Sequence, residues 1–288
     1  MLEDTPPKRS AISPIVQSSV IFAPPVPSTR NVTLPFYPIP AGPHHYVLLE
    51  GRTHGTYSYP DTLVAMENWG GWDWFMTHEK LTEQGMHMLT IRQFVDFLNL
   101  IKSGNAFDGK RQRVSNSKLE ALYGEITNSK ITVKYDEYGI VRHAGNTEWL
   151  DASFTVVDKL FDRFFGKMAM NYGHLMIDDK LTPQYNKEML TGHLNRDTPF
   201  FSLDDWLARA TYQGLPPSDI ALNTAGHNVE YSRPHGKNMG AAWFGSYPAD
   251  FVRQLLGLPS FSRRVLCCSQ DPSNKWSPVC RVRPARVG

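Results

Sequence analysis

Two segments of this 288-residue chain carry a strong helical pattern, and that pattern limits the fold more than any other feature. The first segment runs from Ile91 to about Lys102, with apolar residues at helical spacing: Ile91, Phe94, Val95, Leu98 and Ile101. Thr90 and Gln93 stand in the capping-box positions before it, and Gly104 is typical of a helix end. The pattern therefore predicts an amphipathic helix with defined ends.

The second helical segment runs from Leu203 to about Tyr212. Ser202 is predicted as its N-cap, and Asp205 supplies an acidic residue in the first turn, where it complements the helix dipole. Gly214 and Pro216 predict that the helix stops before them.

The remaining patterns are shorter. A weaker helix is predicted over Ser117–Tyr123, and β-branched or apolar runs predict short strands at Ile131–Tyr135, Ile140–His143 and Phe154–Val157. Beyond residue 220, Gly, Pro, Asn and Ser interrupt every apolar patch, which indicates loops and short strands. We therefore expect an α+β fold with two main helices and short antiparallel strands.

Residues 1–45 are rich in proline and cannot form a helix. They predict an extended arm or a loose tail, with one edge strand at Ser19–Phe22, ahead of a domain over 46–288. We see neither a signal peptide nor a transmembrane stretch, so we expect a cytoplasmic protein, or one exported by a route that the sequence does not reveal.

The charge is unevenly distributed along the chain. The formal net charge is +2, yet the segment from Glu230 to Gly288 carries a net +6. A basic tail can bind nucleic acid. Here the arginines are scattered among Pro, Ser and apolar residues without a lysine-rich run, and we expect no nucleic-acid partner.

Cysteine and histidine spacings argue against a metal site. Cys267, Cys268 and Cys280 form no CxxC pair, so we expect free thiols and no structural zinc. His78-Glu79 resembles half of an HExxH motif, but Thr82 stands where the second histidine is needed. We expect each histidine to be a surface or hydrogen-bonded core residue, and we expect neither metal nor cofactor.

His44 and His45 are adjacent, and on an extended chain their side chains would point in opposite directions. A shared ligand role is therefore not expected for them. The chain also lacks a GxSxG elbow, a Walker loop and a GxGxxG fingerprint. We accordingly predict that the protein is not an enzyme.

A dense aromatic cluster lies at Trp69, Trp72, Trp74 and Phe75, interrupted by two glycines. Such a cluster can fill a core beneath a loop or form a platform on which sugars stack. We favour the core interpretation.

Several motifs in a fixed order resemble C-type-lectin folds of the formylglycine-generating-enzyme subfamily. Gly240-Ala241-Ala242-Trp243-Phe244 resembles the Gly-Gly-Ser-Trp element, and Val282-Arg283-Pro284-Ala285-Arg286 resembles the last strand. The segments Leu89–Leu100 and Phe200–Gly214 match the positions of the two helices. Within this subfamily the chain is most similar to variable proteins of archaeal diversity-generating retroelements.

That resemblance implies a hypervariable ligand-binding protein, receptor-like or adhesin-like, whose last fifty or so residues are rewritten at adenines while the scaffold is kept. The variable region would lie at about 240–280. Its partner would be an unidentified protein or cell-surface ligand, and its oligomeric state is open. The sequence departs from the family at Ala241 and Ala242, and at Arg281, where a glycine is usual.

Replacing the adenines of an AAY codon, where Y is C or T, cannot produce Trp, Gln, Lys, Met or Glu. Residues such as Trp243 and Trp276 are therefore expected to be fixed. Ten residues are admissible products and are predicted to form the ligand-binding surface: Phe244, Ser246, Tyr247, Phe261, Arg263, Arg264, Cys268, Ser269, Ser273 and Asn274.

Two alternatives stay open. One is an oxidative enzyme of the formylglycine-generating type, although the paired cysteines expected just after Trp243 are missing. The calcium-dependent sugar motifs of true lectins are missing as well. The other alternative is a structural adhesin like those of tail fibres.

Overall fold

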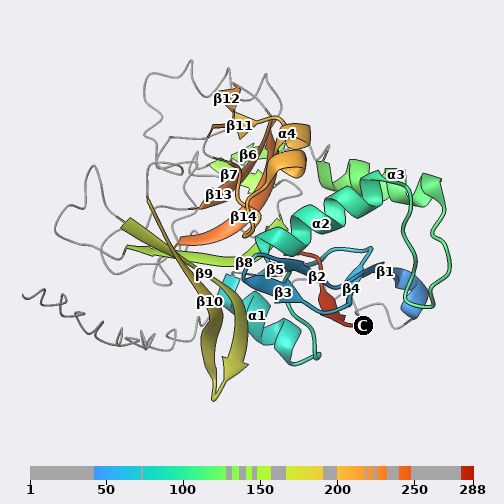
Figure 1. Cartoon of the computed structure of the whole chain (residues 1–288), viewed down its shortest axis with the longest axis horizontal. Coiled ribbons are helices and arrows are strands. Elements are labelled where there is room, and N and C mark those ends of the chain that lie inside the picture. The colour runs from blue at the N-terminus through green and yellow to red at the C-terminus, as the bar shows by residue number, and fades with distance from the viewer. Residues whose placement is uncertain are drawn as a thin grey trace, which may run out of the picture.

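The computed structural model describes most of the chain between residues 42 and 288. The described residues are 42–72, 74–127, 132–135, 141–144, 148–156, 167–190, 200–217, 219–220, 222–223, 226–231, 240–247 and 280–288. They contain four α-helices: α1 (Trp74–Thr82), α2 (Ile91–Lys102), α3 (Asn116–Thr127) and α4 (Leu203–Arg209). Together with several small sheets they make a mixed α+β arrangement, which confirms the predicted class but with more helices than expected (Figure 1).

Helix α2 matches its prediction at both ends. The Thr90 side chain accepts from the Gln93 amide, and the Gln93 side chain accepts from the Thr90 amide, so the capping box is complete. All the predicted apolar positions of α2 are buried. Local side-chain chemistry is therefore sufficient to explain where this helix begins.

The other helices differ from the predictions in length. Helix α3 extends the weak Ser117–Tyr123 prediction at both ends. Helix α4 begins at the predicted residue but stops at Arg209, and Ser202 makes no side-chain cap. Gly214 explains the early stop, because with φ of 88° it lies so close to α2 that a Cβ would come within 2.5 Å of the Arg92 nitrogen. The chain must turn there to pack.

Helix α1 was not predicted as a helix. Its first residues belong to the aromatic cluster, which instead divides between β5 (Trp69–Trp72) and α1. Trp69 and Trp74 are buried, as expected for a core cluster. The core interpretation therefore holds for these two tryptophans.

One three-stranded sheet joins the two ends of the described chain. It has the order β1 (Tyr46–Leu49), β4 (Thr62–Ala65) and β16 (Ala285–Val287), and both pairs are antiparallel. Beside it, β2 (Arg52–His54) and β3 (Tyr57–Tyr59) form a hairpin. Just before β1, Pro43–His45 form a 3₁₀ turn. The expected strand at 19–22 lies outside the described residues.

The largest sheet is mixed and has nine strands. Its main path follows the order β10 (Lys180–Leu190), β9 (Lys167–Ile177), β8 (Glu148–Val156), β14 (Gly240–Tyr247), β13 (Gly226–Tyr231), β11 (Phe200–Phe201) and β12 (Leu222–Asn223). Strand β15 (Cys280–Val282) pairs antiparallel with β5 and parallel with β8. A separate hairpin is formed by β6 (Thr132–Tyr135) and β7 (Val141–Ala144), close to the predicted strands.

Strands β9 and β10 are eleven residues each, so not all strands are short as predicted. They form the long hairpin at the lower part of Figure 1. Asp178 and Asp179 make its two-residue turn with φ of 48° and 58°. Both values are positive, as a turn matching the twist of the strands requires.

Two clusters of buried apolar side chains form the core. The larger one joins α2, α3 and α4 to the sheets and contains Phe94, Trp206 and Phe244. The smaller one lies around α1 and contains Trp74, Trp149 and Val282. Strands β8 and β14 contribute side chains to both clusters, so they form the common support of the fold.

Arg283 fixes the end of the chain. Its guanidinium lies 2.8 Å from Glu148 and donates to the carbonyls of Ala65 and Met66, and its exposed fraction is 2%. A buried charge is tolerated only when it is paired in this way. The pair connects the segment before β16 to the centre of the large sheet.

Candidate functional site

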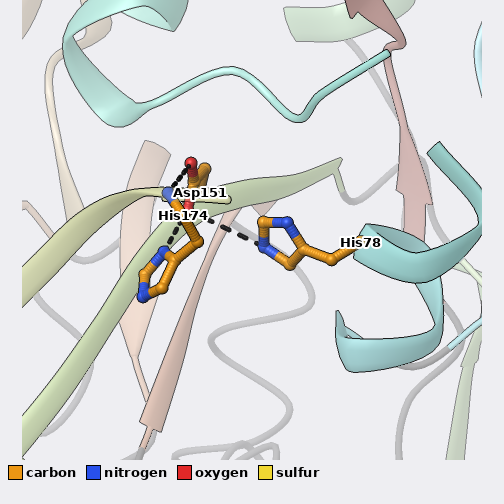
Figure 2. Close-up of side chains that lie close together, drawn as sticks. All are labelled: His78, Asp151 and His174. Carbon is orange, nitrogen blue, oxygen red and sulfur yellow. Dashed lines mark hydrogen bonds and ion pairs between the residues drawn. The ribbon is translucent and has the colours of Figure 1, made fainter. Parts of the chain in front are cut away.

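The most unusual group of polar side chains in the described structure is formed by His78, Asp151 and His174. All three are buried, and one ligand atom from each lies within 4.8 Å of the others. They come from three elements, α1, β8 and β9, as Figure 2 shows. Among the described residues this is the group whose ligand atoms lie close enough together to share one metal ion.

Helix α1 positions His78 through Trp74. The two residues are one turn apart and share a helix face, with ring centroids 4.3 Å apart in an edge-on contact. The Trp74 indole donates to the Leu150 carbonyl at 2.9 Å, which fixes the helix against β8. His78 is thereby directed toward the residue that follows Leu150.

Strands β8 and β9 position the other two side chains. Their ladder ends at the pair Ala152 and Tyr172, and Gly173 follows with φ of 66°. This left-handed conformation, which glycine adopts readily, turns His174 toward Asp151. The His174 amide then donates to Asp151 Oδ2 at 2.8 Å, so a carboxylate replaces the backbone partner that the ladder no longer supplies.

The contacts inside the cluster are unequal. His174 Nδ1 makes a hydrogen bond to Asp151 Oδ1, and its Nε2 lies 3.3 Å from Ser153 Oγ. His78 Nε2 lies 3.7 Å from the same Asp151 oxygen, which is too far for a hydrogen bond. His174 is therefore held at both ring nitrogens, whereas His78 only approaches the carboxylate.

Electrostatics define the protonation state of two members. Burial lowers the pKa of His78 to about 4, although the charge of Asp151 acts in the opposite direction. Burial would raise the pKa of Asp151, but the charge and hydrogen bonds of His174, together with His78, outweigh it and lower that pKa. Near neutral pH the cluster thus presents a carboxylate beside a neutral imidazole with a free lone pair.

His78 Nε2 has no hydrogen-bond partner although it is buried. Within the described residues only Arg92 Nε and Arg283 Nε share that condition. Leaving a buried polar atom unsatisfied costs about 1–3 kcal/mol. Such an atom, aimed at a carboxylate, indicates that the site is built for something more than the contacts inside the chain.

A further histidine lies near the cluster. The charge of His87 acts on His78, and that of Asp151 acts on His87. Burial lowers the pKa of His87, and Asp151 acts against that shift. The His87 backbone is held by two hydrogen bonds to Ala285, of 2.7 and 3.0 Å.

A second buried carboxylate, Asp96 on α2, belongs to a different network. It accepts from Tyr59 at 2.6 Å and from Arg92 at 2.5 Å, and His54 Nε2 lies 2.8 Å away. Arg52 approaches it at 3.8 Å from a half-exposed position. Asp96 is thus surrounded by cationic and neutral donors.

The adjacent pair His44 and His45 departs from its prediction. The chain forms a 3₁₀ turn there, and the ring centroids are 4.3 Å apart instead of pointing to opposite sides. His45 Nδ1 lies 3.1 Å from Glu67, at the surface. The premise of an extended chain was wrong for these two residues.

Of the ten residues predicted for the ligand-binding surface, three lie in the described structure. Phe244 is fully buried, stacked on Trp206 and packed against Phe94. Its placement on an exposed surface is therefore corrected, because Phe244 lies on the face of β14 that packs in the larger core cluster, while Ala241 on the other face is buried in the smaller one. Ser246 and Tyr247 pair through their backbones with His227 and Gly226 of β13. The other seven lie outside the described residues: Phe261, Arg263, Arg264, Cys268, Ser269, Ser273 and Asn274.

Sequence reasoning missed the three residues of the buried cluster. It considered His78 only as part of a helical HExxH motif and rejected that motif correctly. The partners of His78 are instead 73 and 96 positions further along the chain, at Asp151 and His174. A weak signal existed, since Asp151 lies between the apolar residues Leu150 and Ala152, and His174 directly precedes the apolar residues 175–177.

Comparisons of the chain with protein-family models, with curated proteins and with solved structures found no match. In the part of the chain that the structure describes, none of the helices has the length and apolar character needed to cross a membrane.

Proposed function

We propose that the protein is a hypervariable ligand-binding protein on a C-type-lectin-like fold, and that it acts by binding without catalysis. The proposal rests on the sequence resemblance of the C-terminal segments. The structural observation that supports it most is the anchoring of the chain on both sides of residues 248–279.

The anchor before this segment is β14. It lies between β8 and β13 in the large sheet, and Ala241, Ala242 and Phe244 are buried. The anchor after it is formed by β15 and β16. There Val282, Arg283 and Ala285 are buried, and β16 completes the sheet that begins with β1.

Such anchoring suits a protein whose displayed residues change. Because the buried framework on both sides supplies packing and hydrogen bonds, substitutions between the anchors need not disturb it. Seven of the proposed ligand-binding residues lie in this interval. With Ser246 and Tyr247 they form the proposed surface, from which Phe244 is removed.

A genomic comparison tests the origin of the variation. We expect a near-repeat of the codons for about residues 245–280 close to a reverse-transcriptase gene, with mismatches confined to adenines of the repeat. A neighbourhood without that repeat would remove the retroelement part of the proposal.

A library of protein variants tests directly whether the segment between the two anchors tolerates substitutions. Arg263, Arg264 and Ser269 would each be replaced by several residue types, and thermal unfolding measured for each variant. We expect Tm to stay within about 2 °C of the wild type, because surface substitutions usually change stability by no more than about 0.5 kcal/mol.

The matched control is the buried anchor residue Phe244. Phe244→Ala should lower the free energy of unfolding by about 3–5 kcal/mol, because it leaves a cavity between Phe94 and Trp206. If the library variants lose as much stability as this control, the segment is structural and the proposal fails.

A further inference from the structure

We propose that His78, Asp151 and His174 bind one divalent transition-metal ion of the Zn²⁺ type. The ion would connect helix α1 to the two central strands β8 and β9. This metal site goes beyond the proposed ligand-binding function, because it concerns the scaffold and not the variable surface.

The distances fit ligands that share one ion. Atoms bound to one tetrahedral zinc at about 2.0–2.2 Å lie roughly 3.4 Å apart. His78 Nε2 and Asp151 Oδ1 are 3.7 Å apart, and the whole set lies within 4.8 Å. His174 Nδ1 is hydrogen-bonded to the same Asp151 oxygen and would exchange that bond for the metal. The separation that is too long for a hydrogen bond is thus close to the one that a shared metal requires.

The unpartnered nitrogen is the second, independent observation. His78 is 3% exposed, and its Nε2 has no hydrogen-bond partner while facing the carboxylate (Figure 2). In the neutral ring one nitrogen carries the proton and the other carries a lone pair, and with the proton on Nδ1 the lone pair of Nε2 can be given to a metal cation. A metal ion would satisfy this atom and the remaining carboxylate lone pairs together.

The donor types select the class of metal. Two imidazoles and one carboxylate suit zinc and its neighbours, whereas Ca²⁺ and Mg²⁺ prefer sets made of oxygen. No cysteine takes part in this set. Zinc is bound by such ligands in proteins, and it brings no redox chemistry.

The groups around the ligands are arranged to orient them. The His174 amide holds Asp151 Oδ2, and Ser153 Oγ lies 3.3 Å from His174 Nε2. The Trp74 ring contacts His78 and His174 edge-on, at centroid distances of 4.3 and 5.1 Å. Contacts of this kind typically fix the ring orientation and tautomer of metal-bound histidines.

Burial indicates a structural ion. Asp151 and His174 are 2% and 6% exposed, so no substrate reaches the described ligands. Three protein ligands leave one position of a tetrahedral ion for a further ligand. Because β8 also pairs with β14, the ion would stabilise the strand that leads into the variable region.

The test is metal binding by the full-length protein. The purified chain would be treated with a chelator, titrated with Zn²⁺ against a chromophoric competitor, and its metal content measured after dialysis. We expect one zinc per chain and a rise in Tm of about 5–10 °C at a zinc concentration near 100 times Kd.

Variants then locate the site. His78→Gln and His174→Gln should each weaken zinc binding by at least about 100-fold, since even changes around the ligands cost 10–100-fold. His54→Gln is the matched control, because His54 also lies beside a buried carboxylate, and it should bind zinc like the wild type.

X-ray absorption of the zinc-loaded wild type keeps the proposal testable if the variants do not fold. We expect imidazole scattering and no sulfur ligand. A chain that binds no zinc, a zinc bound through sulfur, or a wild-type affinity in His78→Gln would each overturn the proposal. In that case the cluster is a buried ion pair only.

Discussion

Asp151 and Asp96 are both buried carboxylates with histidine beside them, but their surroundings differ in kind. Asp96 receives the Arg92 guanidinium, the Tyr59 hydroxyl and the His54 ring. Asp151 receives His174, while the second histidine stays 3.7 Å away. One carboxylate is neutralised by a permanent cation of the protein, and the other is not.

The unpartnered atoms near the two sites follow the same division. In the Asp96 network the unpartnered atom is Arg92 Nε, an N–H on a cation that repels metals. In the Asp151 cluster it is His78 Nε2, which can offer a lone pair. The comparison shows that burial and charge alone do not define a metal site, because the type of the unsatisfied atom decides what can bind.

The largest expected effect is a loss of stability at Asp96 that does not depend on metal, in contrast to the Asp151 cluster. Asp96→Asn should lower the free energy of unfolding by about 3–5 kcal/mol, because it leaves the buried Arg92 without its counter-charge. Denaturant unfolding with and without a chelator measures it. The loss should be the same in both conditions; a loss that appears only without the chelator would contradict the comparison.

The next prediction compares His54, beside Asp96, with His78, beside Asp151. In the presence of a chelator, His54→Phe should cost about 1–2 kcal/mol, because it removes a partner of the Asp96 charge. His78→Phe should cost less than about 1.5 kcal/mol, because it removes an atom that is already unsatisfied. Added zinc should stabilise the wild type and His54→Phe but not His78→Phe. Equal responses to zinc would break the distinction.

A smaller effect concerns the Tyr59 hydroxyl, which donates to Asp96. Tyr59→Phe should cost about 1–2 kcal/mol at neutral pH, where the bond to a charged acceptor is lost. Chemical denaturation of the two proteins in parallel measures it, and a neutral effect would show that Arg92 and His54 suffice.

The same Tyr59 hydroxyl predicts that the stability of the fold depends on pH in the alkaline range. Burial raises the pKa of Tyr59 above its usual value, and the hydrogen bond and charge of Asp96 raise it further. The phenol therefore ionises first in the unfolded chain, near pH 10. Its contribution to stability is present below that pH and is lost as pH rises toward the folded pKa. Unfolding curves between pH 9 and about 11 should fall less steeply for Tyr59→Phe than for the wild type.

The smallest effect concerns the start of α2, the helix that carries Asp96 and Arg92. Thr90→Ala should cost about 1 kcal/mol, because it removes the capping bond to the Gln93 amide. It also removes the partner of the buried Tyr57 hydroxyl at 2.8 Å. Thr90→Ser keeps both bonds and serves as the control. A cost in the serine variant equal to that in the alanine variant would exclude the cap as the cause.

Local chemistry accounts for the parts of the fold that were predicted. The limits of α2 follow from Thr90, Gln93 and an apolar stripe that are adjacent in the chain. Helix α4 began as predicted but ended early, because Gly214 packs against α2, a contact between distant segments. Helix α1 was missed because its tryptophans were grouped with the strand residues before them, from which the pattern alone could not separate them.

The candidate site, in contrast, could not be predicted from the sequence. His78, Asp151 and His174 have no motif spacing, and their convergence depends on three contacts between distant segments. These are the Trp74 bond to Leu150, the pairing of β8 with β9 and the turn at Gly173. Phe244 was misplaced for a related reason, since elements distant in the sequence cover both faces of β14.

The sequence by itself determined the α+β class and the capped helix, because those features depend on neighbouring residues and on periods of two or 3.6. The tertiary structure alone decided which polar side chains became buried together. A single strand or helix cannot desolvate a histidine beside a carboxylate; that requires the packing of α1 on β8 and β9.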